Sequence, residues 1–118
     1  MEREEILSGL LLEMRRGSIV LAVLSQLEAP MYGYHLVNVL SQSGIAVEVN
    51  TLYPLLRRLE GQGVLMSEWE TSGAKPRKYY VLTPEGKELY ETLKRYWNEV
   101  VTSMDVLMGE KNDAKRTD

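Results

Sequence analysis

The chain has 118 residues, of which 44% are apolar, with a formal net charge of −3 and no cysteine. This length corresponds to about one domain, and the absence of cysteine excludes a disulfide framework, thiolate chemistry and zinc–cysteine sites. One histidine and scattered carboxylates offer neither a nucleophile–base pair nor a clustered metal site. We therefore expect no enzyme activity, no cofactor and no metal.

The sequence has no run of about 18 apolar residues, and its first residues, MEREE, are acidic, unlike those of a secretory signal. We expect a soluble, cytoplasmic protein without a membrane partner. The negative net charge argues mildly against nucleic-acid binding. The local charge differs, because residues 71–80 carry Lys75, Arg77 and Lys78 and no acidic residue.

The N-terminal segment is predicted to be helical. Residues 1–17 form a helical extension whose apolar residues follow a helical spacing, at Ile6, Leu7, Leu10, Leu11 and Met14. Gly9 and Gly17 leave open whether this extension continues into the next helix. Residues 18–27 are apolar almost all round, so this helix must be buried on both sides. In a domain of this size, such burial favours a second chain over the outer side.

Residues 31–44 predict a second helix that Gly44 ends. We place Leu36, Val37 and Leu40 inward and His35, Asn38 and Ser41 outward. A lone histidine on a polar helix face is most often solvated, so His35 receives no catalytic or metal role. Residues 45–49 alternate in polarity like a very short strand.

Residues 50–63, NTLYPLLRRLEGQG, predict a short helix that contains Pro54. A helix tolerates proline in its first turn, where the N–H groups lack partners, so we expect Asn50 or Thr51 to be the N-cap. Gly61 is the expected left-handed C-cap. The apolar face consists of Leu52, Leu55, Leu56 and Leu59, and we expect Tyr53, Arg57 and Arg58 to point elsewhere.

Residues 64–70 and 77–83 are two β-prone runs joined by TSGAKP, which predicts a hairpin with a basic tip. Tyr79 and Tyr80 alternate faces, so one is expected in the core and the other at the hairpin base. Thr83 and Pro84 then predict a helix start with an N-cap and a proline at the first position. That helix extends to about Met108, and the polar residues 109–118 are expected to be disordered.

Three helices, a hairpin and a long helix are the element order of a winged helix-turn-helix. The predicted fold is mainly α with a small β-hairpin. Residues 18–83 form the DNA-binding domain, and residues 84–108 form a C-terminal dimerisation helix. In such a domain the third helix, here residues 51–61, enters the major groove while the hairpin tip contacts the DNA beside it.

Three segments also resemble one protein family. MRRGSIVLAVLSQLEAPMYGYHLVNVL, NTLYPLLRRLEGQGVL and KPRKYYVLTPEGKELY are similar, in collinear order over residues 14–108, to the PadR family of bacterial transcriptional regulators. The resemblance implies a homodimeric repressor that often responds to a small molecule. The single C-terminal helix resembles the compact subfamily with multidrug-responsive members, in which a pore at the dimer centre holds a tryptophan. Trp97 lies where that tryptophan would fall.

The DNA-binding prediction can be stated residue by residue. The predicted contacts are Tyr32, Asn50, Thr51, Tyr53, Pro54, Arg57, Lys75, Arg77 and Lys78, on a pseudo-palindromic operator bound by a homodimer. Ordinary solvation of Tyr53 and Arg57, or an edge-protecting role for the hairpin cations, is the structural alternative. The alternative function is a winged-helix protein–protein adaptor that does not bind DNA.

The last helix carries an apolar stripe that predicts the dimer interface. It consists of Leu89, Leu93, Tyr96, Trp97, Val100, Met104 and Leu107. If two such helices meet at a two-fold axis, Trp97 with the small residues Ser18 and Ala22 would line a slot for an aromatic or cationic effector. The alternative is that Trp97 simply fills the interface. The sequence leaves open whether an effector exists and whether the regulator represses or activates.

Overall fold

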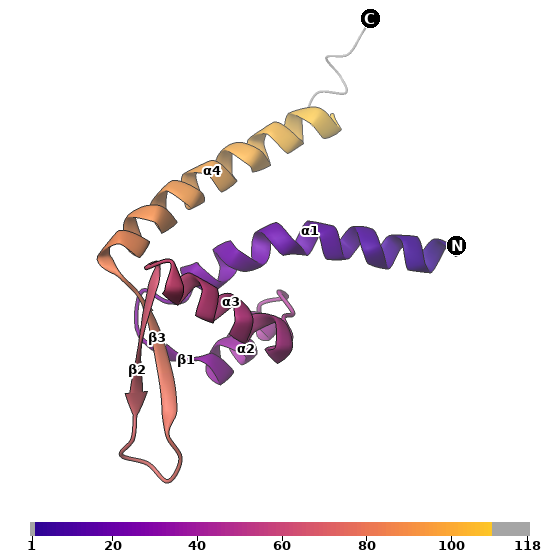
Figure 1. Cartoon of the computed structure of the whole chain (residues 1–118). Coiled ribbons are helices and arrows are strands. Elements are labelled where there is room, and N and C mark those ends of the chain that lie inside the picture. The colour runs from indigo at the N-terminus through magenta and orange to yellow at the C-terminus, as the bar shows by residue number, and fades with distance from the viewer. Residues whose placement is uncertain (1, 110–118) are drawn as a thin grey trace, which may run out of the picture.

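The computed structural model describes residues 2–109 and contains four helices and a small three-stranded sheet (Figure 1). The elements are α1 (Arg3–Ser25), β1 (Met31–Tyr32), α2 (Gly33–Gln42), α3 (Val49–Gly61), β2 (Leu65–Glu70), β3 (Arg77–Leu82) and α4 (Pro84–Met108). This is the predicted winged-helix order. The hairpin of β2 and β3, residues 65–82, is called the wing below. Of the tail predicted to be disordered, residues 109–118, the structure describes only Gly109, which is the left-handed C-cap of α4 with a φ of 78°; residues 110–118 lie outside the described residues.

One apolar core holds the end of α1, α2, α3 and the base of the wing together. Its largest fully buried side chains are Val23, Leu24, Leu27, Leu36, Leu52, Leu56, Leu65 and Leu82. Burying each of these stabilises the fold by about 1.5–3 kcal/mol relative to exposure. The inward positions predicted for α2 hold, since Leu36 and Leu40 are buried and Val37 is half-buried. The core therefore fixes α3 relative to the wing.

α1 is one continuous helix from Arg3 to Ser25, so neither Gly9 nor Gly17 interrupts it. From residue 18 to its end no side chain of α1 is exposed: Ile19, Val23 and Leu24 are in the core, and the others are half-buried. The extension of residues 1–17 therefore continues directly into the first helix of the domain.

The sheet has the order β1–β3–β2 with antiparallel pairing throughout. The sequence does not predict the third strand, β1, because residues 31 and 32 are assigned to the second helix. Met31 and Tyr32 are instead extended and pair with Tyr80 and Tyr79. A strand of two residues is too short to show the period-two pattern that identifies strands.

The predicted strand at residues 45–49 is wrong. Residues 45–48 form a loop without strand pairing, although Val47 is buried and its neighbours Ala46 and Glu48 are exposed. The backbone N–H of Ile45 instead caps α2 by donating to the Leu40 carbonyl at 2.9 Å. The alternation in the sequence thus reflects a loop that is buried on one side.

α3 begins at Val49 with Glu48 as its N-cap, so the predicted caps Asn50 and Thr51 are wrong. The Glu48 carbonyl accepts the N–H groups of Thr51 and Leu52, which closes the first turn before Pro54 is reached. Pro54 therefore lies inside the helix. Its missing N–H leaves the Asn50 carbonyl without its usual helical donor, and the exposure of Asn50 lets water take that place.

The predicted left-handed cap at Gly61 is also wrong. Gly61 is the last residue of α3, and the positive φ of 79° falls on Gly63. Gln62 is the C-cap, and its N–H donates to the Arg58 carbonyl. The turn into the wing therefore needs glycine two residues later than expected.

α4 begins as the sequence predicts, with Thr83 as N-cap and Pro84 at the first helical position. The Thr83 Oγ1 accepts the Gly86 N–H at 2.9 Å and donates to the Gly63 carbonyl at 2.7 Å. A Cβ at Gly86 would lie 2.0 Å from the Val64 carbonyl oxygen, so only glycine fits there. The start of α4 is therefore tied to the base of the wing.

Candidate nucleic-acid interface

A groove of about 850 Å³ separates α2 and α3 from the wing. Six of the nine predicted DNA-binding residues line it: Tyr32, Tyr53, Arg57, Lys75, Arg77 and Lys78. His35, Asn38 and Trp69 line it as well. The remaining three, Asn50, Thr51 and Pro54, are exposed in the first two turns of α3 and lie outside this groove. The fold thus brings the cations of the helix and of the wing to one surface.

Arg57 is exposed on α3, and no acidic side chain within residues 2–109 forms an ion pair with it. Its guanidinium is therefore free to reach a base edge or a phosphate. Arg58 is also exposed but lines a different hollow, together with Arg16 of α1 and Pro54. Arg57 is accordingly the arginine of α3 that lines this groove.

Tyr53 combines a place in the groove with a packing role. It is half-buried, and a Cβ at Gly33 of α2 would meet three atoms of its phenol group at 2.8–2.9 Å. Desolvation raises the pKa of Tyr53, with smaller contributions from Tyr80 and Tyr34. The expectation that Tyr53 points away from the core is therefore only partly met, because its ring also sets the spacing between α2 and α3.

Lys78 differs from the other wing cations because it has an acidic partner. Its Nζ lies 3.5 Å from a carboxylate oxygen of Glu60 on α3, and it lies over the rings of Trp69 and Tyr80 at 5.7 and 5.5 Å. Glu60 also accepts a hydrogen bond from Ser67 of β2. Glu60 therefore links α3 to both strands of the wing, and Lys78 is only partly available to a phosphate.

The wing tip carries a carboxylate that the segment 71–80 did not reveal. Glu70 lies opposite Arg77 in the sheet register, and its side chain accepts the Ser72 hydroxyl and the Ser72 N–H, the latter at 2.8 Å. These hydrogen bonds, led by that of the hydroxyl, lower the pKa of Glu70. Lys75 in the connecting loop is exposed and has no ion pair among the described residues. The tip is thus less uniformly basic than its sequence suggests.

Tyr32 and Tyr79 form a pair that the sequence did not predict. Their rings stack with centroids 4.1 Å apart, and the Tyr32 hydroxyl donates to the Tyr79 hydroxyl at 2.6 Å. Tyr80, on the other face of β3, is in the core, as expected for one of the two neighbouring tyrosines. The pairing becomes visible only once β1 is known to be a strand.

Comparison with known proteins agrees with this geometry. The model of the transcriptional regulator PadR-like family matches residues 20–92, which is more than half of the chain. The chain belongs to this family. It is 32% identical, over 86% of its length and 94% of the relative's, to the transcriptional regulator Rv3488 of Mycobacterium tuberculosis.

Solved structures of PadR-like regulators share the fold. A PadR family transcriptional regulator from Eggerthella lenta superposes with a TM-score of 0.84 at 48% identity, covering 91% of this chain and 96% of that one. A PadR-like transcriptional regulator from Bacillus cereus gives a TM-score of 0.74 at 29% identity, covering 81% and 96% of the two chains. Within residues 2–109, no helix has the length and apolar character needed to cross a bilayer.

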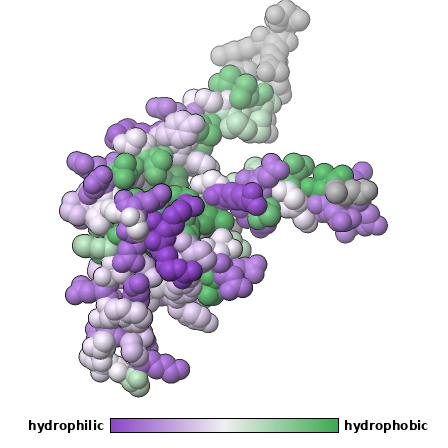
Figure 2. All heavy atoms as spheres, viewed as in Figure 1, coloured by the Kyte–Doolittle hydropathy of each residue, from purple (hydrophilic) through white to green (hydrophobic). Residues whose placement is uncertain are grey.

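As in Figure 1, α1 and α4 of this PadR-like chain project from the body, away from the wing. The radius of gyration is 18.0 Å, compared with about 13 Å for a compact chain of this length. Apolar residues follow both projecting helices (Figure 2). In the predicted stripe of α4, Leu89, Leu93, Tyr96, Trp97, Met104 and Leu107 are exposed and Val100 is half-buried. Large apolar patches of this kind mark interaction surfaces.

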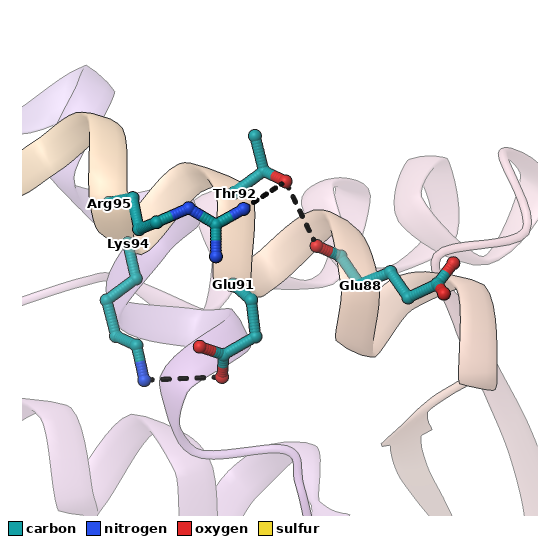
Figure 3. Close-up of polar contacts among 5 residues, drawn as sticks. All are labelled: Glu88, Glu91, Thr92, Lys94 and Arg95. Atoms are coloured by element: carbon teal, nitrogen blue, oxygen red, sulfur yellow. Dashed lines mark hydrogen bonds and ion pairs between the residues drawn. The ribbon is translucent and has the colours of Figure 1, made fainter.

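Polar contacts join residues of α4 that lie outside this stripe (Figure 3). Lys94 pairs with Glu91 at 3.2 Å, and this partner raises the pKa of Lys94. The Arg95 guanidinium donates to the Thr92 hydroxyl, which in turn donates to the Glu88 carbonyl. These polar side chains of α4 thus have hydrogen-bond partners within the helix, whereas most of its apolar stripe is exposed. A helix of this kind is suited to pack its stripe along a partner helix.

An apolar cleft of about 310 Å³ lies between α1 and α4. Its lining includes Ser18 and Trp97 of the predicted slot, with Met14, Leu93 and Tyr96 around them. Ala22, the third predicted residue, is half-buried and does not line the cleft. One chain alone therefore forms an apolar recess beside the Trp97 indole.

Proposed function

We propose that this PadR-like regulator binds a pseudo-palindromic operator as a homodimer and represses transcription by occluding the promoter. The observation that carries the proposal is the shared groove, in which Arg57 of α3 faces the same space as Lys75 and Arg77 of the wing. A reader helix beside a cationic hairpin matches the docking geometry of helix-turn-helix proteins on DNA.

In this arrangement α3 enters the major groove and Arg57 reaches a base edge, where arginine pairs most often with guanine. Lys75 and Arg77 contact phosphates beside that groove, which fixes position without reading sequence. The two copies of α3 in the dimer then lie about 34 Å apart, in successive major grooves of one DNA face. Half-sites of the operator are accordingly centred about one helical turn apart.

Gel-shift or anisotropy measurements with the DNA that flanks the protein's own coding region test the proposal. Arg57→Ala should cost about 1–3 kcal/mol of binding to a shifted palindrome and relax its sequence preference. Lys75→Ala should weaken binding to all sequences about equally. Unchanged operator affinity in a variant that combines Arg57→Ala with Lys78→Ala would contradict the proposal.

The homodimer forms, in this proposal, when the stripe on α4 packs against the first helix of a second copy. The exposed apolar residues on the projecting parts of α1 and α4 support this arrangement, because a monomer leaves both surfaces in water. A two-fold axis makes the contact mutual, so one surface serves both chains.

A ligand-sensing role is supported by a separate observation, the apolar cleft beside Trp97. In the dimer this recess would accept a planar aromatic molecule by offset stacking, or a cation by attraction to the indole face. A ligand that binds two interchain arrangements unequally would shift the spacing of the two α3 helices and release the operator.

Tryptophan emission tests the ligand site once Trp69, the other of the two tryptophans, is replaced by phenylalanine. In this Trp69→Phe background, planar cationic dyes should quench the remaining Trp97 signal with dissociation constants below about 100 μM. Absence of quenching in that range, or equal dye binding after Trp97→Ala, would show that Trp97 only fills the interface.

A further inference from the structure

We infer that Tyr32 is a positioning residue for DNA binding, whose ring holds the Arg77 guanidinium in place for a phosphate contact. The inference rests on the proposed function, since it assigns Arg77 to the DNA backbone. It differs from the expectation that the Tyr32 hydroxyl itself touches a phosphate. In the structure that hydroxyl is engaged, because it donates to the Tyr79 hydroxyl.

The Tyr32 ring has a fixed orientation. Tyr32 ends β1, pairs with Tyr79 in the sheet and is also the N-cap residue of α2, so its backbone is held from two sides. Its ring stacks on that of Tyr79 with an angle of 21° between the planes. Backbone pairing, ring stacking and the bond between hydroxyls together leave the Tyr32 ring little freedom.

Arg77 extends from β3 over this ring. Its guanidinium carbon lies 5.1 Å from the Tyr32 ring centroid, within the distance of a cation–π contact. Arg77 and Tyr79 are two residues apart on one strand, so they emerge on the same face of the sheet. Arg77 is exposed, and among the aromatic rings of residues 2–109 that of Tyr32 is the one over which its guanidinium lies.

The neighbouring carboxylate does not capture Arg77. Glu70 is its cross-strand partner, where an ion pair would be expected, but the Glu70 carboxylate accepts both hydrogen bonds of Ser72 instead. No acidic oxygen lies within 4.0 Å of the Arg77 guanidinium in the described residues. The Arg77 guanidinium therefore contacts the Tyr32 ring and not a carboxylate.

Contact through the ring face suits a phosphate ligand. A guanidinium that lies on an aromatic face keeps its in-plane N–H donors, which match phosphate oxygens in a bidentate geometry. An arginine on an exposed wing otherwise samples many rotamers, and ordering them opposes binding. The Tyr32 ring therefore lowers the entropic cost of the Arg77–phosphate contact without occupying its donors.

The experiment measures binding of the full chain to a fluorescein-labelled random-sequence duplex of about 30 base pairs in low salt, because phosphate contacts are independent of sequence. Arg77→Ala should weaken binding about tenfold, and Tyr32→Leu about three- to tenfold. The double variant should bind no more weakly than Arg77→Ala alone, since Tyr32 acts through Arg77. Tyr32→Phe keeps the ring and should stay within about twofold of the wild type.

One further readout and the double variant separate this role from a general loss of structure. In NMR spectra without DNA, the Arg77 Nε–H signal should show a ring-current shift that Tyr32→Leu removes and Tyr32→Phe retains. The effect of Tyr32→Leu on DNA affinity should also vanish in the Arg77→Ala background, whereas unfolding would weaken both backgrounds.

Three results would overturn the inference while leaving DNA binding by the wild type intact. They are unchanged affinity in Tyr32→Leu, equal losses from Tyr32→Leu with and without Arg77, and a loss in Tyr32→Phe as large as that in Tyr32→Leu. The last would assign the phosphate contact to the hydroxyl. A wild-type protein that does not bind the duplex at all would instead overturn the proposed function, and the role of Tyr32 with it.

Discussion

Glu60 near the end of α3 and Lys78 of β3 form an ion pair of 3.5 Å that joins the helix proposed to read DNA to the wing beside it. Glu60 also accepts the Ser67 hydroxyl from the second strand of the wing. One carboxylate thus contacts both strands of the wing and pairs with a lysine that, in the proposed function, lies beside DNA.

Glu60→Gln should increase DNA affinity in low salt by about two- to fivefold, because Lys78 becomes available to a phosphate and a negative charge is removed. The free energy of unfolding should fall by only about 0–1 kcal/mol, since the pair is partly exposed and glutamine still accepts from Ser67. Glu99→Gln removes the same charge from α4 and should leave DNA affinity nearly unchanged. A weaker complex with Glu60→Gln would show that wing orientation outweighs the freed lysine.

Gly61 and Gly63 should respond oppositely to alanine. Gly61 is helical with open space around its Cα, so Gly61→Ala should stabilise the fold by up to about 1 kcal/mol. Gly63 has a φ of 79°, so Gly63→Ala should destabilise it by about 1 kcal/mol or more. Urea denaturation measures both changes. Destabilisation by Gly61→Ala together with stabilisation by Gly63→Ala would show that the left-handed residue is Gly61.

These glycines also show which parts of the fold the sequence predicts. The helices, the wing, the Thr83 cap and the amphipathic α4 follow from periodicity and turn chemistry, which act over a few residues. The start of α3 at Val49, the true turn glycine and the two-residue strand β1 depend on which backbone groups find partners across the fold. Sequence patterns carry little of that information.

The candidate site divides in the same way. Arg57 and Lys75 could be predicted because a helix face and a hairpin tip are local features. The engagement of Lys78 by Glu60 and the stack of Tyr32 on Tyr79 could not, since they join residues 18 and 47 positions apart.

The stability of the protein should fall as the pH rises above about 10, in part because of Tyr79. The hydrogen bond that Tyr79 shares with the Tyr32 hydroxyl, followed by desolvation, raises the pKa of Tyr79 above the ordinary value of 10.0. The folded state therefore holds this proton more tightly than the unfolded state. Its contribution is complete below the unfolded pKa and is lost as the pH rises through the folded pKa. Denaturation of the wild type and of Tyr79→Phe measures the free energy of unfolding from pH 8 to about pH 11. The variant should lose less stability over this range than the wild type. An equal pH dependence of the two proteins would contradict this role of Tyr79.

Light scattering at micromolar concentration should give twice the 13.5 kDa mass of one chain. Leu93→Glu places a charge in the apolar stripe and should shift the protein toward the monomer, because a buried unpaired charge is costly. Thr92→Glu adds the same charge on α4 outside this stripe and should leave the mass unchanged. A wild-type mass of one chain, or equal masses for the two variants, would contradict the proposed interface.

The salt dependence of DNA binding tests the central claim most directly, because it separates a DNA reader from a protein–protein adaptor that uses an apolar surface. Two wings that each place Lys75 and Arg77 on phosphates should release about four counterions, so the plot of log affinity against log salt concentration should have a slope of about −4 or steeper. Lys75→Ala should make that slope shallower, by about one for each phosphate that the variant no longer neutralises. A slope near zero, with binding unchanged between low and high salt, would contradict DNA recognition by this groove.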